Sequence, residues 1–287
     1  MRLKLVFLFL LAGMQSSTAA GIEIKRDITY SADTTTGPEN QLDVYYPKDI
    51  TTTKDVLVFI HGGSWNSGKK ETYWWLGRNM ARKNVVTIII NYSLSPAASY
   101  EKMAADCAKA LKWVSANVGS YGGDRDRIFV MGHSAGAHLA SLIHSDQRFF
   151  KKEGIPDPIQ GIILNDAFGL DMFEYLSKAK QDASTGSFLK TFSTDQEVWK
   201  IASPLYYLKN FEAPVLVFVG ERTYPAIQIQ SERLRKDLAD SNRKATLKII
   251  PKKRHIPMIV QMISSGNVLY DYILDFMRDI TKSKVKG

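Results

Sequence analysis

A serine between two glycines is the residue of this sequence best suited to covalent chemistry. Ser134 lies at the centre of the motif G-H-S-A-G, residues 132–136, which follows the apolar run 128–131 and precedes a segment with helical spacing, residues 137–144. This motif between a strand and a helix predicts a sharp turn that exposes the serine, because glycines allow a turn in which side chains would clash. We therefore predict Ser134 as the nucleophile, activated by a neighbouring base.

Hydrogen-bond donors for a developing negative charge are expected from two loops. Acyl transfer places negative charge on the carbonyl oxygen of the substrate, and each preorganised N–H donor lowers the barrier by about 3 to 4 kcal/mol. The motif H-G-G-S-W, residues 61–65, follows the apolar run 56–60, and its glycines let the backbone turn its amides toward the serine. We predict an oxyanion hole formed by the amides of Gly63, Ser64 and Ala135, the last at a helix start.

The general base is predicted by elimination. The five histidines are His61, His133, His138, His144 and His255. Two belong to the glycine motifs, and two lie on the helix that the serine opens, where a side chain packs or faces solvent rather than reaching back over the serine. Only His255 lies on a loop after a predicted strand. It also completes the chain order serine, acid, histidine that accompanies a G-x-S-x-G serine between a strand and a helix. We therefore predict His255 as the base.

Apolar runs that alternate with helical segments must position these groups. Runs rich in Val, Ile and Phe, typical of strands buried on both faces, occupy residues 56–60, 85–92, 128–131, 161–164 and 215–219. Between them lie segments in which apolar residues recur every three or four positions, as in amphipathic helices. This alternation indicates crossover units, and so an α/β fold with a parallel sheet.

Further elements are expected at the ends of the chain. Residues 23–30 and 42–46 are predicted as an antiparallel edge, residues 246–250 as the last strand, and residues 268–280 as a closing helix. The sequence therefore predicts a mostly parallel eight-stranded sheet with helices on both faces. The regular pattern weakens over residues 168–212, which we interpret as a small helical cap insertion rather than a second domain.

Five motifs taken together resemble the α/β-hydrolase esterases. They are H-G-G-S-W (61–65), N-Y-S-L-S-P (91–96), D-C-A-K-A-L-K-W-V (106–114), Y-G-G-D-R-D-R-I (121–128) and G-H-S-A-G-A-H-L-A (132–140). The set is most similar to the branch that holds hormone-sensitive-lipase-like, feruloyl-esterase-like and kynurenine-formamidase-like enzymes, and the resemblance covers residues 42–255. It implies the α/β-hydrolase fold and hydrolysis of carboxylic esters through an acyl-enzyme, without a cofactor or a metal.

The sequence departs from this family at the acid of the triad. The family usually places the acid three residues past a glycine after the strand 215–219, and Thr223 occupies that position here. One alternative is Asp166, after the preceding strand, to which the acid is moved in some members of the fold class. Another is Glu221, two residues before the usual position. The third is a triad without a charged acid, since loss of the acid in a serine protease costs about 10⁴ in rate but leaves residual activity.

Aromatic side chains near the predicted site bear on the substrate. They are Trp65, Tyr73, Trp74, Trp75, Phe168, Phe173 and Tyr175. Such rings on loops would stack on a phenolic acid or a sugar, and Trp65 is predicted to contact the substrate; packing beneath the insertion is the alternative. We predict a serine carboxylesterase acting on a small-molecule ester, aromatic or carbohydrate-linked. The alternatives are an arylformamidase or amidase of the same fold, and a non-catalytic binding protein with an incomplete triad.

Composition and charge exclude several other classes. Hydrophobic residues at 45% and charged residues at 23% are ordinary for a globular protein and exclude a disordered or collagen-like chain. The net charge of +9 comes from scattered basic residues rather than a basic stripe interleaved with aromatics, so nucleic-acid binding is not predicted. Cys107 is the single cysteine, which excludes an intrachain disulfide and a cysteine-rich zinc site.

The first twenty residues are similar to a secretory signal peptide. Arg2 and Lys4 form a basic start, residues 5–12 are apolar, and small residues lead to Ala20. The apolar run is too short for a membrane span, which needs about 20 residues. We predict cleavage near Ala20 and one hydrolase domain over residues 21–287, secreted or periplasmic, with no membrane association after cleavage.

Overall fold

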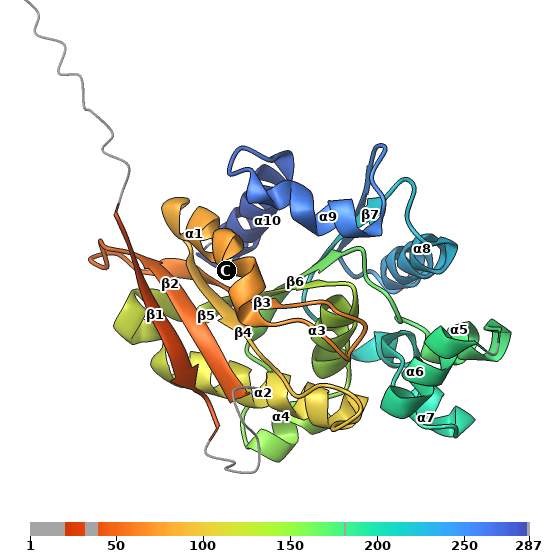
Figure 1. The fold of residues 1–287 in the computed structure, drawn as a ribbon. Helices are drawn as coiled ribbons and strands as arrows, with labels where there is room; N and C mark the ends of the chain where they lie inside the picture. Colours follow the sequence, from red (N-terminus) through yellow and green to blue (C-terminus); the bar gives the residue numbers. More distant parts are fainter. Residues whose placement is uncertain (1–20, 32–39, 181, 286–287) are drawn as a thin grey trace, which may run out of the picture.

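An eight-stranded sheet runs through the protein (Figure 1). The computed structural model describes residues 21–31, 40–180 and 182–285, so the predicted signal peptide, residues 1–20, lies outside the described residues. The strand order is β1-β2-β4-β3-β5-β6-β7-β8. The strands are β1 (Ile22–Thr29), β2 (Gln41–Pro47), β3 (Lys54–Ile60), β4 (Val86–Ile90), β5 (Gly123–His133), β6 (Ile159–Asn165), β7 (Val215–Gly220) and β8 (Ala245–Ile250).

Antiparallel pairing is confined to one edge of the sheet. β1 pairs with β2 and β2 pairs with β4 in antiparallel register, whereas every pair from β4 to β8 is parallel. Parallel strands are covered on both faces, and accordingly every residue of β4 and of β7 is buried. The predicted mostly parallel eight-stranded sheet is confirmed.

Helices cover both faces of this sheet. Successive side chains of a strand point to opposite faces. Val56 and Val58 of β3 therefore join the core under the helices of residues 100–117, 135–145 and 225–240, while Leu57 and Phe59 join the core under the helices of residues 74–82 and 268–285. The α-helices outside the insertion are α1 (Trp74–Arg82), α2 (Tyr100–Asn117), α3 (Ala135–Ser145), α4 (Arg148–Glu153), α8 (Pro225–Asp240), α9 (His255–Val260) and α10 (Val268–Val285). The predicted α/β class is thus confirmed.

Three short helices lie between β6 and β7, in the segment predicted as a cap insertion. In Figure 1 they are grouped at one side of the molecule. Each begins after an aspartate whose side chain accepts a hydrogen bond from a backbone amide of the first turn; these are Asp171, Asp182 and Asp195. Such caps satisfy amides that have no partner within the helix. The helices are α5 (Met172–Lys178), α6 (Ala183–Phe192) and α7 (Gln196–Ile201), followed by the 3-10 helix η4 (Pro204–Asn210).

No helix within the described ranges is both long enough and apolar enough to cross a lipid bilayer.

Candidate active site

Ser134 occupies a strained turn between β5 and α3. Its backbone lies at φ 54° and ψ −120°, a region that residues other than glycine rarely adopt. A Cβ at Gly132 would lie 2.3 Å from the backbone of Gly136, and a Cβ at Gly136 would lie 2.1 Å from the carbonyl oxygen of Ile60. Both glycines are therefore required by the close approach of backbone segments, which the sequence motif had indicated.

The imidazole of His255 reaches the hydroxyl of Ser134 from the other end of the chain. His255 is the first residue of α9, after the loop that follows β8. Its Nε2 lies 2.8 Å from Ser134 Oγ, within hydrogen-bond distance. The structure thus brings together the two residues predicted as nucleophile and base.

The carboxylate of Asp166 completes the chain of contacts. Asp166 follows β6, is fully buried, and its Oδ2 lies 2.6 Å from His255 Nδ1. With Nδ1–H donating to this carboxylate, Nε2 is left as the acceptor for the Ser134 hydroxyl. Of the alternatives that the sequence left open, the structure brings Asp166 into contact with the imidazole.

Thr223, at the position where the resemblance would place the acid, holds the carboxylate instead. Its hydroxyl donates to Asp166 Oδ2, and the Gly220 amide donates to Asp166 Oδ1 at 2.8 Å. The end of β7 therefore supplies two donors to an acid that comes from β6. Hydrogen bonds to the ionised form of a carboxylate stabilise its charge.

Glu221 has a different role in the structure. Its side chain is exposed, and its Oε2 accepts a hydrogen bond from the Lys252 amide at 2.6 Å. This contact joins the loop after β7 to the loop that leads to His255, where Lys252 has a positive φ of 61°. Glu221 thus braces the loop, while the imidazole itself contacts Asp166.

The backbone around Gly63 lies against the serine turn. Gly63, Ser64 and Trp65 have φ values of 131°, 51° and 60°, and Gly63 and Ser64 line the same cavity as Ser134. A Cβ at Gly62 would lie 2.8 Å from the carbonyl oxygen of His133, so the loop approaches the turn at backbone distance. Ala135 is the first residue of α3, where an amide has no partner within the helix. Gly63, Ser64 and Ala135 therefore all lie next to Ser134.

Buried groups fix the segment that carries these amides. His61 stacks on Tyr92, and the Tyr92 hydroxyl donates to the His61 carbonyl at 2.9 Å. Burial lowers the pKa of His61 to about 4, so its ring is neutral at neutral pH. Further along, the ammonium of Lys70 is buried and contacts Asp43 at 2.8 Å and Asp27 at 2.5 Å. The Lys70 ion pairs tie the end of this segment to the antiparallel edge of the sheet, a role that the sequence analysis missed.

A cavity of about 850 Å³ opens over Ser134 and His255. Its walls include Trp75 at the start of α1, Phe168 and Phe188 at the insertion, residues 224–226 at the start of α8, and apolar side chains of the segment 256–263. None of its described lining residues is Asp, Glu, Lys or Arg. The segment 256–263 was not predicted as part of the site, although an apolar run directly after the predicted base was a visible signal.

Trp65 does not contact this cavity, and the prediction that it binds substrate is corrected. The side chain is 0% exposed, and its ring packs at right angles against Phe188 and Phe192 of α6. Its Nε1–H donates to Nδ1 of His138 at 3.3 Å. The positive φ of Trp65 turns the side chain under the insertion, so the tryptophan packs against the core, which was the alternative interpretation.

The remaining histidines are engaged elsewhere. His138 Nε2 contacts the Ala202 carbonyl at 2.7 Å, and burial lowers the pKa of His138 to about 4. His144 Nδ1 lies 2.6 Å from Asp157, and its Nε2 accepts from two backbone amides. In the described part of the chain, no group of three or more His, Cys, Asp or Glu side chains is arranged to hold a metal ion.

Comparisons with known proteins agree with this architecture. The family model BD-FAE matches residues 42–238, more than half of the chain. The isoprenylcysteine alpha-carbonyl methylesterase of Arabidopsis thaliana is 26% identical over 83% of this chain and 58% of its own length, and the kynurenine formamidase of Salmo salar is 25% identical over 84% and 79%. The chain spans little more than half of the length of several plant methylesterases that it matches.

The fold also has close structural counterparts. The crystal structure of esterase B from Lactobacillus rhamnosis superposes with a TM-score of 0.78 at 22% sequence identity, covering 92% of this chain and 88% of that one. At this identity the likeness concerns the fold. Together with the family match over residues 42–238, it identifies this chain as an α/β-hydrolase that belongs to the BD-FAE family.

Proposed function

We propose that this chain is a serine hydrolase that cleaves carboxylic esters of small molecules through an acyl-enzyme. The observation that carries the proposal is the continuous line of contacts from Ser134 Oγ through His255, 2.8 Å to Nε2 and 2.6 Å from Nδ1, to the buried Asp166 carboxylate. A serine, an imidazole and a carboxylate in this order form the arrangement that activates a hydroxyl for acyl transfer.

Acylation begins at the hydroxyl. Ser134 Oγ attacks the ester carbon while its proton passes to His255 Nε2, and Asp166 stabilises the resulting imidazolium through Nδ1–H. The negative charge on the former carbonyl oxygen is held by the amides of Gly63, Ser64 and Ala135. Collapse of this intermediate breaks the ester C–O bond, and the alcohol leaves with the proton of Nε2.

Deacylation repeats the same steps with water. His255 Nε2 takes a proton from water as the water oxygen attacks the acyl carbon. The oxyanion forms again at the same amides, and its collapse returns the proton to Ser134 Oγ and releases the acid. Every proton transferred in the cycle therefore passes through His255 Nε2. Residues of this chain carry out each step.

The cavity supports an uncharged, partly aromatic group around the scissile bond. Its described lining holds no Asp, Glu, Lys or Arg, while the rings of Tyr73, Phe168 and Phe188 face the same space. Burying a charged group without a partner is costly, so a neutral group is favoured there. The methylesterase and the formamidase among the relatives support hydrolysis of an acyl bond in this chain.

The test is turnover together with active-site labelling. We expect the protein to hydrolyse 4-nitrophenyl acetate and to be labelled by a fluorophosphonate at Ser134. Ser134→Ala should abolish both, and His255→Ala should reduce turnover almost as far. A folded native protein that shows neither turnover nor labelling would support the binding-protein alternative and refute the proposal.

An arylformamidase is the second candidate, favoured by the match to a kynurenine formamidase over most of both chains. Ser134 Oγ would attack the formyl carbon of an N-formyl aryl amine as its proton passes to His255, which then protonates the leaving nitrogen. Comparing kcat/KM for N-formylkynurenine and for phenyl acetate separates the two. A large preference for the formamide would replace the esterase proposal by this one.

We also propose that the enzyme acts outside the cytoplasm, because residues 1–20 have the composition of a secretory signal. Expression of the full chain in a bacterium should yield a shortened product that begins near Gly21 in the exported fraction. N-terminal sequencing of that product is the measurement, and an uncleaved cytoplasmic chain would contradict the proposal.

A further inference from the structure

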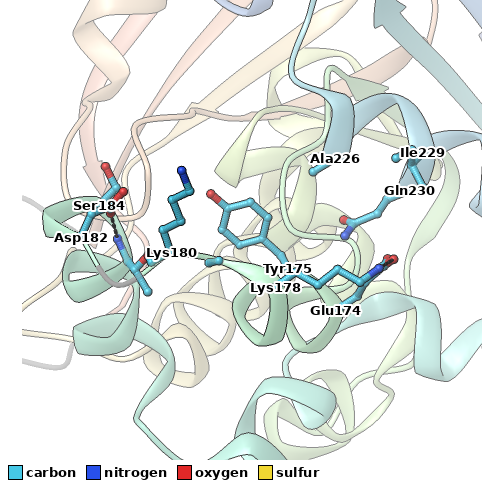
Figure 2. A pocket seen from close by; sticks show the side chains of 11 residues that line it. Glu174, Tyr175, Lys178, Lys180, Asp182, Ser184, Ala226, Ile229 and Gln230 are labelled. Atoms are coloured by element: carbon cyan, nitrogen blue, oxygen red, sulfur yellow. Dashed lines mark hydrogen bonds and ion pairs between the residues drawn. The ribbon is translucent and has the colours of Figure 1, made fainter.

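A second hollow adjoins the active-site cavity at the insertion (Figure 2). It has a volume of about 430 Å³ and lies between α5, the start of α6 and the start of α8. The two hollows share the lining residues Tyr175, Ser184 and Ala226. We call this second hollow the annex. The shared lining makes the annex and the active-site cavity direct neighbours.

Charge distinguishes the annex from the cavity. The described lining of the cavity has no Asp, Glu, Lys or Arg, whereas Glu174, Lys178, Lys180 and Asp182 line the annex. A ligand that fills both hollows is therefore in an uncharged environment at the scissile bond and beside charged groups at its far end. Such a ligand is amphiphilic.

Both carboxylates of the annex already have partners. Glu174 Oε1 accepts from Lys178 Nζ at 2.7 Å, and Asp182 Oδ1 accepts from the Thr185 amide at 3.0 Å as the cap of α6. The hydrogen bonds that hold Asp182 lower the pKa of this carboxyl, so it is ionised and committed to the helix start. Each acid therefore already has one oxygen engaged within the chain.

Lys180 is the basic side chain of the annex without a direct ion pair to a described residue, although its charge helps to lower the pKa of the nearby Asp182 carboxyl. It is exposed and forms no ion pair within 4.0 Å with any residue that the structure describes. In Figure 2 its ammonium and the hydroxyl of Tyr175 point to the same side, while Lys178 and Glu174 extend together in another direction. Burial raises the pKa of Tyr175, so its hydroxyl is protonated and can donate a hydrogen bond.

We propose that the annex binds an anionic group at the far end of the ester substrate, with Lys180 as the cation and the Tyr175 hydroxyl as the donor. This inference rests on the proposed esterase function and deepens it. The substrate class is an ester that is apolar around the scissile bond and carries an acidic group, such as a carboxylate, at one end. The contact is exposed, and exposed ion pairs contribute little, so it adjusts specificity over a modest range.

The experiment compares matched ester pairs. One series is the mono-4-nitrophenyl esters of linear dicarboxylic acids, each paired with the 4-nitrophenyl alkanoate of equal chain length. A second series places the carboxylate on the alcohol side, with phenyl acetates that carry a carboxyalkyl chain and their uncharged methyl analogues. The measured quantity is the ratio of kcat/KM for the anionic ester to that for the neutral one.

We expect Lys180→Met to lower this ratio about three- to fivefold at the best chain length in one series, and Lys180→Glu about tenfold or more. The difference should shrink as salt is added, because ions screen exposed charges. Lys190→Met is the matched control, since Lys190 is an exposed lysine of α6 that does not line the annex; its ratio should equal that of the native enzyme. An unchanged ratio in both Lys180 variants and both series would overturn the proposal, whereas failure to hydrolyse any neutral ester would instead refute the esterase function.

A separate set of contacts surrounds the imidazole of His255. The ring of His133 stacks on it, with centroids 4.9 Å apart and planes at 26°, and His133 Nε2 lies 3.3 Å from the carbonyl oxygen of His255. The ring of Tyr224 packs against it at 5.2 Å and 55°. His133 is 2% exposed, and burial together with the nearby His255 lowers its pKa to about 3.

The geometry points to His133 as a positioning residue for the base, through its ring stack and its Nε2–H donor. His255 follows a loop, residues 251–254, in which three residues are exposed or strained, so its location depends on tertiary contacts. A neutral ring at His133 covers the imidazole without repelling the imidazolium that forms during acylation. Misplacement of the base by a fraction of an ångström lowers the rate of proton transfer.

Two variants separate the contributions. His133→Phe keeps a flat ring without a donor, and His133→Gln keeps a donor without a ring. We expect each to lower kcat by about tenfold and to slow fluorophosphonate labelling of Ser134 in parallel. The low-field NMR signal of the His255 Nδ1 proton should exchange faster with water in both, a change that a purely structural role would not produce. Native kcat and an unchanged proton signal in both variants would overturn the assignment.

Discussion

Replacement of Asp166 by asparagine tests the triad at the point where this chain departs from its family. In the native structure Asp166 accepts three hydrogen bonds: from Gly220 N, from the Thr223 hydroxyl and from His255 Nδ1. An asparagine keeps one oxygen, which the Gly220 amide requires. Its NH₂ group then faces Nδ1, where a donor now meets a donor.

The imidazole must change tautomer to remove this conflict. His255 would carry its proton on Nε2 and accept at Nδ1, so Nε2 could no longer take the proton of Ser134. The same change in a serine protease lowers kcat about 10⁴-fold, and we expect a loss of about 10³ to 10⁴ here, which corresponds to about 4 to 5 kcal/mol of barrier. The fold should be retained, because asparagine has nearly the same shape as aspartate.

The assay is kcat for 4-nitrophenyl acetate at neutral pH, with fluorophosphonate labelling and thermal unfolding as checks. Glu221→Gln is the matched control, because Glu221 braces the Lys252 amide rather than the imidazole; its kcat should remain within about threefold of native. If Asp166→Asn keeps more than about a tenth of native kcat, or if Glu221→Gln loses as much as Asp166→Asn, the assignment of the acid is refuted.

Three further predictions follow from particular contacts. Thr223→Val removes a donor to the Asp166 carboxylate, and we expect about a tenfold loss of kcat at unchanged KM in steady-state kinetics; a native rate would show that the hydroxyl is dispensable. Gly136→Ala places a Cβ 2.1 Å from the Ile60 carbonyl oxygen, so circular dichroism should show a lowered melting temperature. Assays should show a loss of at least about a hundredfold in kcat/KM. A variant with native melting temperature and activity would contradict the packing argument. Burial lowers the pKa of His61, His133 and His138 from 6.5 to about 4, 3 and 4, respectively. As the pH falls below about 6.5, these histidines take up protons in the unfolded chain but not in the folded one, so the free energy of unfolding decreases. Each histidine should lower the free energy of unfolding by an amount on the order of 2 kcal/mol between pH 7 and 5. Urea unfolding at the two pH values measures this, and equal free energies of unfolding would refute it.

The sheet was predictable because its signals are local. The runs at β3, β4 and β7 are apolar over consecutive residues, as strands covered on both faces must be. Short breaks separate these runs from the segments whose apolar residues have helical spacing. The start of β5 was missed, since residues 123–127 are polar and charged. There Arg127 pairs with Asp55 and Asp124, which allows a charged segment to extend a strand at the surface.

Sequence by itself determined the nucleophile turn and the glycine loop, because each depends on neighbours within a few positions. It also predicted His255, because the other four histidines lie in the glycine motifs or on the helix that follows the serine. It left the acid open, since Asp166 and His255 are 89 residues apart and only the strand order β6-β7-β8 brings that carboxylate to the imidazole. Tertiary structure also decided that Trp65 packs under α6 and that the segment 256–263 forms a wall of the cavity. Local patterns specify what each segment becomes, whereas the contacts between strand ends depend on how the whole sheet is ordered.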